Sequence, residues 1–71
     1  MFSTTTKYAL KALVNLARAP AGTSIFGHDL AQRAGIPSHY LSKVMTALRN
    51  AGLVDATRGL GGGYRLSKPA D

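Results

Sequence analysis

The chain has 71 residues, no cysteine and 45% hydrophobic residues, which suits one small folded domain and excludes disulfides, thiolate nucleophiles and cysteine metal ligands. Nine lysines and arginines oppose three acidic residues, and the formal net charge of +6 favours a polyanionic partner. No basic and apolar leader and no apolar run near ~18 residues occurs, so we expect a cytoplasmic protein without a membrane span.

Apolar residues at helical spacing predict a first helix that ends near Ala19, with the hydroxyls of Thr4–Thr6 as its expected caps. The segment 20–23 contains proline and glycine and interrupts the helix. The short apolar run Ser24–Phe26 follows and predicts a brief strand.

A second helix is expected from Gly27 to Gly35, where glycine can adopt the left-handed conformation that ends many helices. Ser38 is the predicted N-cap of a third helix, which closes at 50–52. An apolar stripe at i, i+3, i+4 and i+7 identifies the buried side of this helix: Leu41, Val44, Met45 and Leu48.

The hydrophobic pattern then changes, which predicts strands over 53–58 and 64–66 around a glycine-rich turn. Tyr64 and Leu66 are expected to anchor the return strand to the helices, and 68–71 form a tail. The predicted fold is therefore one domain over 1–71, mainly α with a small β-hairpin: a winged helix-turn-helix of three helices plus a wing.

Two short helices joined by a glycine-containing turn form a helix-turn-helix. Here Ala31 is small where the helices cross, Gly35 bends the chain and Ile36 fills the angle between them. In this motif the N-terminal residues of the second helix face base edges in the major groove of DNA. The candidate contacts are Pro37, Ser38, His39, Tyr40, Ser42 and Lys43, with Thr46 and Arg49 further along the exposed face.

Several of these candidates have a structural alternative. The Ser38 hydroxyl would be occupied by the backbone if it caps the helix, and His39 could be an ordinary solvated residue. The ring of Tyr40 could pack at the edge of the core and offer only its hydroxyl to a phosphate. Lys43 has the simpler role of a phosphate or guanine contact, whereas Arg49 would contact the DNA backbone or nothing.

Five segments carry a resemblance to a known family: TKYALKAL (6–13), LAQRAGI (30–36), YL (40–41), LRNAGLV (48–54) and RGLGGGYRL (58–66). Together they resemble the IscR/NsrR/CymR family of bacterial winged-helix transcription regulators. The resemblance implies that the third helix reads the major groove, while the wing, with Arg58 at its base, approaches the minor groove. The implied wing contacts are Arg58, Gly59, Gly61, Gly62 and Arg65, and the residues expected near the DNA backbone are Thr5, Lys7, Tyr8 and Arg49.

The resemblance also implies homodimers that bind palindromic operators in double-stranded DNA, mostly as repressors. Family chains are longer and carry a dimerisation helix and, in some members, cysteines for an iron–sulfur cluster. This chain stops where that part would start, so we expect no cofactor in it. Because Leu13, Leu16 and the stripe of the third helix use the apolar residues for the core, we expect a monomer or a weak dimer. Ser42 stands where some relatives have an acidic residue, so the operator sequence does not transfer.

An enzyme or a nucleotide-binding site fits the sequence poorly. A dinucleotide-binding fingerprint from Gly59 would require a third glycine at the position of Tyr64, and a P-loop would require a Gly-Lys pair, which the chain lacks. The glycines also precede a strand and not the helix N-terminus that binds phosphate. His28 and His39 lie on different predicted helices, so we expect no metal site.

The remaining alternative is a winged helix that binds protein or RNA, because a fold does not determine a function. The basic residues Lys43, Arg49, Arg58 and Arg65 favour a phosphate-containing partner over a protein surface.

Overall fold

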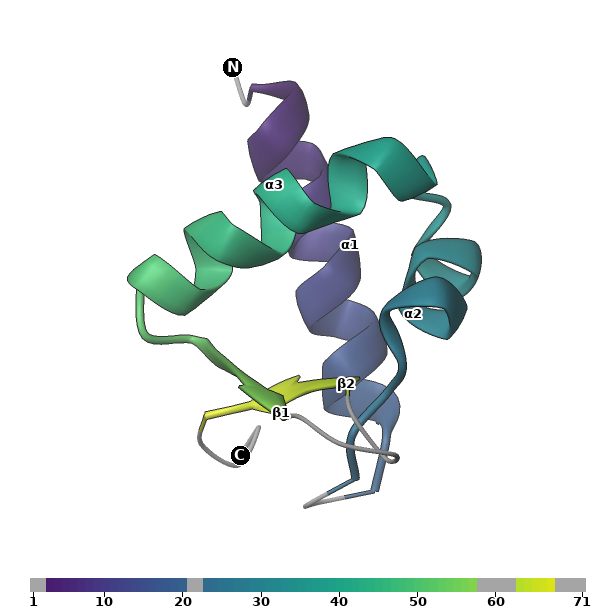
Figure 1. Ribbon diagram of the computed structural model, residues 1–71, viewed down its shortest axis with the longest axis vertical. Coiled ribbons are helices and arrows are strands. Elements are labelled where there is room, and N and C mark those ends of the chain that lie inside the picture. The colour runs from purple at the N-terminus through teal and green to yellow at the C-terminus, as the bar shows by residue number, and fades with distance from the viewer. Residues whose placement is uncertain (1–2, 21–22, 58–62, 68–71) are drawn as a thin grey trace.

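The computed structural model describes residues 3–20, 23–57 and 63–67. Its elements follow in the order α1 (Thr4–Arg18), α2 (Gly27–Ala34), α3 (Ser38–Asn50), β1 (Val54–Thr57) and β2 (Gly63–Leu66). In Figure 1, α3 crosses α1, α2 lies beside them, and the hairpin of β1 and β2 lies below α3. This order and arrangement confirm the predicted fold of three helices followed by a β-hairpin.

The start of α1 differs from the prediction by one residue. Ser3 has extended backbone angles, and its hydroxyl oxygen accepts a hydrogen bond from the Thr6 amide at 3.1 Å. Ser3 is therefore the cap, and the prediction of Thr4–Thr6 as caps is wrong because these residues are already helical. A serine that precedes the first helical residue is well suited to this role.

The start of α3 also differs from the prediction. Ser38 is the first helical residue and not the N-cap, which is Pro37, and no side chain caps this helix. The Pro37 carbonyl accepts hydrogen bonds from the amides of Tyr40 and Leu41 at 2.9 and 3.1 Å. Ser38 therefore does not act as the cap, and its side chain is exposed.

Gly35 ends α2 as predicted. Its φ of +68° lies in the left-handed region, and the Ile36 amide donates to the Ala31 carbonyl at 2.9 Å. Such a reversal satisfies carbonyl groups at the end of the helix and turns the chain sharply. Ile36 is consequently buried directly after the bend and packs between the helices.

The core forms where the three helices and the hairpin meet. The predicted stripe of α3 is buried, as are Ala31 and Ile36, which confirms the interpretation of the helix-turn-helix. The full buried set is Ala12, Leu16, Ile25, Leu30, Ala31, Ala34, Ile36, Leu41, Val44, Met45, Leu48 and Val54. α1 contributes only Ala12 and Leu16 to this set, with Ala9 and Leu13 half-buried beside them.

A second side of α1 contradicts the expectation that no apolar surface is left over. Leu10 is 46% exposed and Val14 is 48% exposed. The two residues are four positions apart and share a helix face that neither α3 nor the hairpin covers. Together with Lys11, Asn15, Arg33 and Ala34, they line a shallow cavity of about 330 Å³ between α1 and α2. The core therefore does not use all the apolar residues, although their use in the core was the reason for expecting a monomer or a weak dimer. The oligomeric state stays a prediction.

The hairpin is attached to the helices through its main chain. β1 and β2 are antiparallel, with Val54 opposite Leu66 and Thr57 opposite Gly63. The predicted strand over 24–26 is reduced to one bridge, in which Ile25 and Tyr64 exchange two backbone hydrogen bonds of 2.8 Å. The strand stops there because Phe26 is already the N-cap of α2.

Gly63 is required by this attachment. A Cβ atom at this position would lie 2.7 Å from the carbonyl carbon of Ile25 and 3.0 Å from the Phe26 nitrogen. Both neighbours are main-chain atoms, so they cannot move aside as a side chain would. Tyr64 and Leu66 pack against the core as predicted.

Within the described residues, no helix has the length and hydropathy to cross a membrane.

Candidate nucleic-acid interface

The exposed side of α3 is polar and basic. None of its exposed residues carries a carboxylate. The exposed residues of α3 are Ser38, His39, Ser42, Lys43, Thr46, Ala47, Arg49 and Asn50. Leu41, Val44 and Leu48 hold the opposite side in the core. The fold therefore presents one flank of α3 to solvent, and the charge of that flank is positive.

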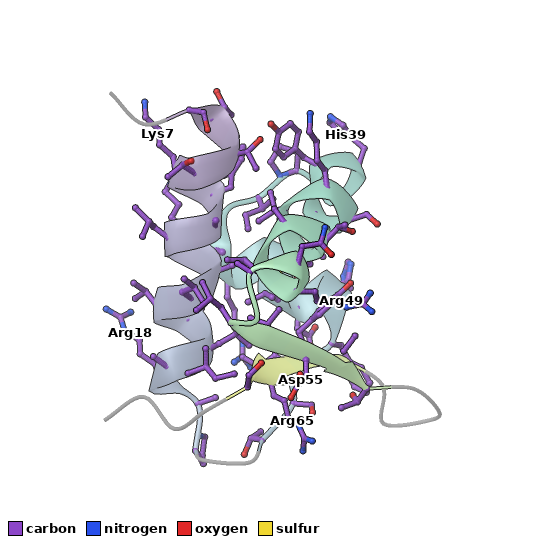
Figure 2. All side chains as sticks on the ribbon, turned by 90° about the vertical axis from the view of Figure 1, so that its left-hand side faces the viewer. Lys7, Arg18, His39, Arg49, Asp55 and Arg65 are labelled. Carbon is purple, nitrogen blue, oxygen red and sulfur yellow. The ribbon has the colours of Figure 1, made fainter. Side chains whose placement is uncertain are left out.

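The predicted contacts from α3 gather on one side of the molecule. His39 and Arg49 lie on the same side in Figure 2, and Arg18 lies on the opposite side. His39 stands in the first turn of α3 and Arg49 in its last, so the basic flank extends along the whole helix. Lys43 stands between these two residues in the sequence, and its amine lies 5.6 Å from the centre of the Tyr40 ring.

The ring of Tyr40 packs against the edge of the core, as its structural alternative predicts. Its ring meets the Tyr8 ring edge-on, with the centroids 5.3 Å apart and the planes at 60°. Its hydroxyl lies 2.6 Å from the Thr5 hydroxyl, and the two share a hydrogen bond. The side chain is half-buried between α1 and α3. Tyr40 therefore belongs to the contact between two helices, and its hydroxyl already has a partner within the protein.

The three candidates at the start of α1 occupy different environments. The Thr5 hydroxyl and the Tyr8 ring both contact Tyr40, and both residues are half-buried. Lys7 is exposed and lies at the same end of the molecule as His39 in Figure 2. Lys11 is also exposed, and its amine lies 5.9 Å from the centre of the Tyr8 ring, because residues three positions apart are neighbours on a helix.

The wing is described only at its base. Arg58, Gly59, Gly61 and Gly62, which the sequence predicts as wing contacts, lie outside the described residues. Arg65 is exposed and pairs in register with Asp55 on β1. Tyr64 and Leu66, on either side of it, pack against the core. Because neighbouring side chains of a strand point to opposite faces, Arg65 points away from the helices.

The fold has relatives of known class. The family model Rrf2, described as an iron-dependent transcriptional regulator, matches residues 2–71. The chain belongs to the Rrf2 family. It is 44% identical over 71 residues to the HTH-type transcriptional regulator IscR of Cereibacter sphaeroides, covering 97% of this chain and 46% of the relative. It is 38% identical over 65 residues to IscR of Photobacterium profundum, covering 92% and 38%.

Two solved structures of this family share the architecture. The first is CymR, the global cysteine regulator of B. subtilis, with a TM-score of 0.89 and 35% identity over all of this chain and 55% of that one. The second is IscR of T. potens, with a TM-score of 0.84 and 33% identity over 97% and 50%. The Rrf2 chain described here thus spans less than half the length of the curated relatives named above. The predicted resemblance and the winged-helix fold are confirmed, and the relatives are transcription regulators and not enzymes.

The iron in the family description has no fitting site in these residues. The sequence contains no cysteine, and no three residues of the types His, Cys, Asp or Glu lie together within 3–20, 23–57 and 63–67. His28 and His39 stand on α2 and α3 respectively. Iron sites in proteins use several such ligands together.

Proposed function

We propose that the chain is the DNA-binding domain of a bacterial transcription regulator, and that it inserts α3 into the major groove of an operator. The observation that carries the proposal is the exposed flank of α3, which presents His39, Lys43 and Arg49 and no carboxylate. A major groove admits one α-helix, and lysine and arginine side chains bind both phosphates and guanine edges. The winged-helix relatives named above are transcription regulators, which supports the same function.

The remaining parts of the proposal come from the sequence. Arg58 and the glycines Gly59, Gly61 and Gly62 form the wing contact with the minor groove, where the negative potential favours arginine. The operator is a palindrome in double-stranded DNA, the protein acts in the cytoplasm and represses transcription by occupying it, and longer relatives bind such operators as homodimers. The 71-residue chain alone, with its net charge of +6, is a monomer or a weak dimer because like charges oppose association. It needs no cofactor to bind DNA.

The test is selection of bound duplexes from a random DNA pool, followed by titration of the selected duplex at two salt concentrations. A shared motif and a loss of affinity of at least tenfold between ~50 and 200 mM salt are expected, because phosphate contacts release counterions. Single-stranded RNA of matched length serves as the comparison. Enrichment of no motif, or tighter binding to the RNA, would contradict the proposal.

A further inference from the structure

The first two turns of α3 hold His39 and Lys43, two of the three residues on which the proposed function rests, yet the start of the helix is weakly fixed. No side chain caps α3, whereas Ser3 caps α1. Helix ends without a side-chain cap leave amide groups unsatisfied and fray more readily. His39, Ser42 and Lys43 are all exposed and contribute little packing that could hold this turn in place. Leu41 is buried and fixes the other side of the turn.

The contact between Tyr40 and α1 supplies what the missing cap does not. The hydroxyls of Tyr40 and Thr5 are 2.6 Å apart although the residues are 35 positions apart in sequence. Among the described residues, this is the one hydrogen bond between side chains that joins two helices. Hydroxyl pairs at this separation are well-formed hydrogen bonds. The first turn of α3 is thereby connected to the first two turns of α1.

The Tyr40 ring is held on its other sides too. Tyr8 lies three residues after Thr5, on the same face of α1, and meets the ring edge-on at 5.3 Å. Lys43 places its amine 5.6 Å from the ring centre, so the ring also supports a basic side chain of the exposed flank. We call Thr5, Tyr8 and Tyr40 the α1–α3 anchor.

We propose that Tyr40 is a positioning residue: through its contacts with Thr5 and Tyr8, it fixes the orientation in which α3 presents its exposed side chains to DNA. The inference rests on the proposed function, since it assigns a role within the same interface. A base contact depends on the direction of the donor, whereas attraction to phosphates depends mainly on charge. Loss of the anchor therefore reduces discrimination between sequences more than it reduces general affinity for DNA.

The experiment uses four variants of the chain: Tyr40→Phe, Thr5→Val, the double variant and Thr4→Val. The first two each remove one hydroxyl of the shared hydrogen bond and keep the shape of the side chain. Thr4→Val makes the same chemical change at the neighbouring exposed residue and is the matched control. Each protein is titrated, well below its unfolding temperature, with the selected duplex and with a scrambled duplex of equal length and composition.

We expect Tyr40→Phe and Thr5→Val each to weaken binding to the selected duplex by about threefold to tenfold, the value of one hydrogen bond. Binding to the scrambled duplex should change by less than about twofold, and the double variant should be no weaker than either single variant, because one interaction is lost. Thr4→Val should behave as the wild type. A purely structural role would leave the ratio of the two affinities unchanged.

Three results would overturn the inference. A loss for Tyr40→Phe without one for Thr5→Val would mean that the Tyr40 hydroxyl contacts DNA directly. Equal losses on both duplexes would indicate a general effect and not positioning. Wild-type affinities for both variants would remove any role for the hydrogen bond. If the wild-type chain itself does not distinguish the two duplexes, the proposed function fails first and the inference falls with it.

Discussion

The two ends of the candidate interface are attached to the rest of the molecule by different means. At the first turn of α3, side chains make the connection: the hydroxyls of Thr5 and Tyr40 and the rings of Tyr8 and Tyr40. At the hairpin, two main-chain hydrogen bonds of 2.8 Å between Ile25 and Tyr64 add to the packing of the Tyr64 and Leu66 side chains against the core. Both attachments join segments that are distant in sequence.

The difference determines how each end responds to a change in sequence. A side-chain contact loses one interaction when one atom is removed, and the neighbouring side chains can adjust. A main-chain contact tolerates almost any side chain that points away from it, but it requires a glycine where the two backbones approach closely. The glycine-rich segment therefore includes at least one glycine, Gly63, that is required by the packing of two backbones and not by a ligand.

The largest expected effect comes from adding one carbon at the main-chain attachment. Gly63→Ala should lower the free energy of unfolding by about 1–3 kcal/mol, because the new Cβ meets the Ile25 backbone and the strand must move. Urea denaturation followed by circular dichroism measures this change.

Gly27→Ala is the matched control for that variant. A Cβ on Gly27 would lie 3.2 Å from a methyl carbon of Leu41 and 3.4 Å from the Tyr64 ring, which are side-chain atoms that can shift. Gly27 is also the first residue of a helix, where alanine is preferred to glycine. We expect a change of less than about 1 kcal/mol. Equal destabilisation by the two variants would contradict the distinction between main-chain and side-chain attachment.

The second-largest expected effect is on the DNA affinity of α3, the end of the interface that side chains hold in place. Lys43→Ala should weaken binding to all duplexes by about tenfold near 0.1 M salt and reduce the slope of log affinity against log salt by about 1, because one phosphate contact is lost. Arg18→Ala removes a cation from the opposite side of the molecule and should change neither quantity. Fluorescence anisotropy over a salt series measures both. A slope that falls equally for the two variants would mean that the net charge, and not the face of α3, governs binding.

The smallest effect is on the stability of the anchored turn. Tyr40→Phe should lower the free energy of unfolding by about 1 kcal/mol, and Thr5→Val should add little to it in the double variant, since both remove the same hydrogen bond. Urea denaturation of the two single variants and the double variant gives the coupling. Additive losses would show that the two hydroxyls act independently.

Local patterns allowed most of the fold to be predicted from the sequence. The stripe of Leu41, Val44, Met45 and Leu48 repeats at helical spacing, and Gly35 is the residue that a left-handed turn favours, so each carries its own signal. The cap of α1 is not predictable at this level, because hydroxyl residues stand side by side at 3–6 and only their backbone angles distinguish Ser3 from Thr4–Thr6. At α3 the cap is Pro37, one residue before the predicted Ser38.

The remaining errors concern contacts between distant residues. Whether the Tyr40 hydroxyl faces solvent or Thr5 depends on how α1 and α3 cross, which no local spacing reveals. The same holds for Leu10 and Val14, which are apolar like core residues but lie half-exposed on the face of α1 that lines the cavity beside α2. The close approach at Gly63 likewise depends on Ile25, 38 positions earlier in the chain.

The most direct test of the central claim is a titration of the ¹⁵N-labelled chain with the selected duplex, followed by amide chemical shifts in NMR spectra. A chain of 71 residues is small enough for its backbone amide signals to be followed one by one. We expect the largest shifts in the first two turns of α3, at His39, Ser42 and Lys43, while Arg18 and its neighbours on α1 stay unchanged. Largest shifts along the cavity between α1 and α2, with α3 unaffected, would contradict it.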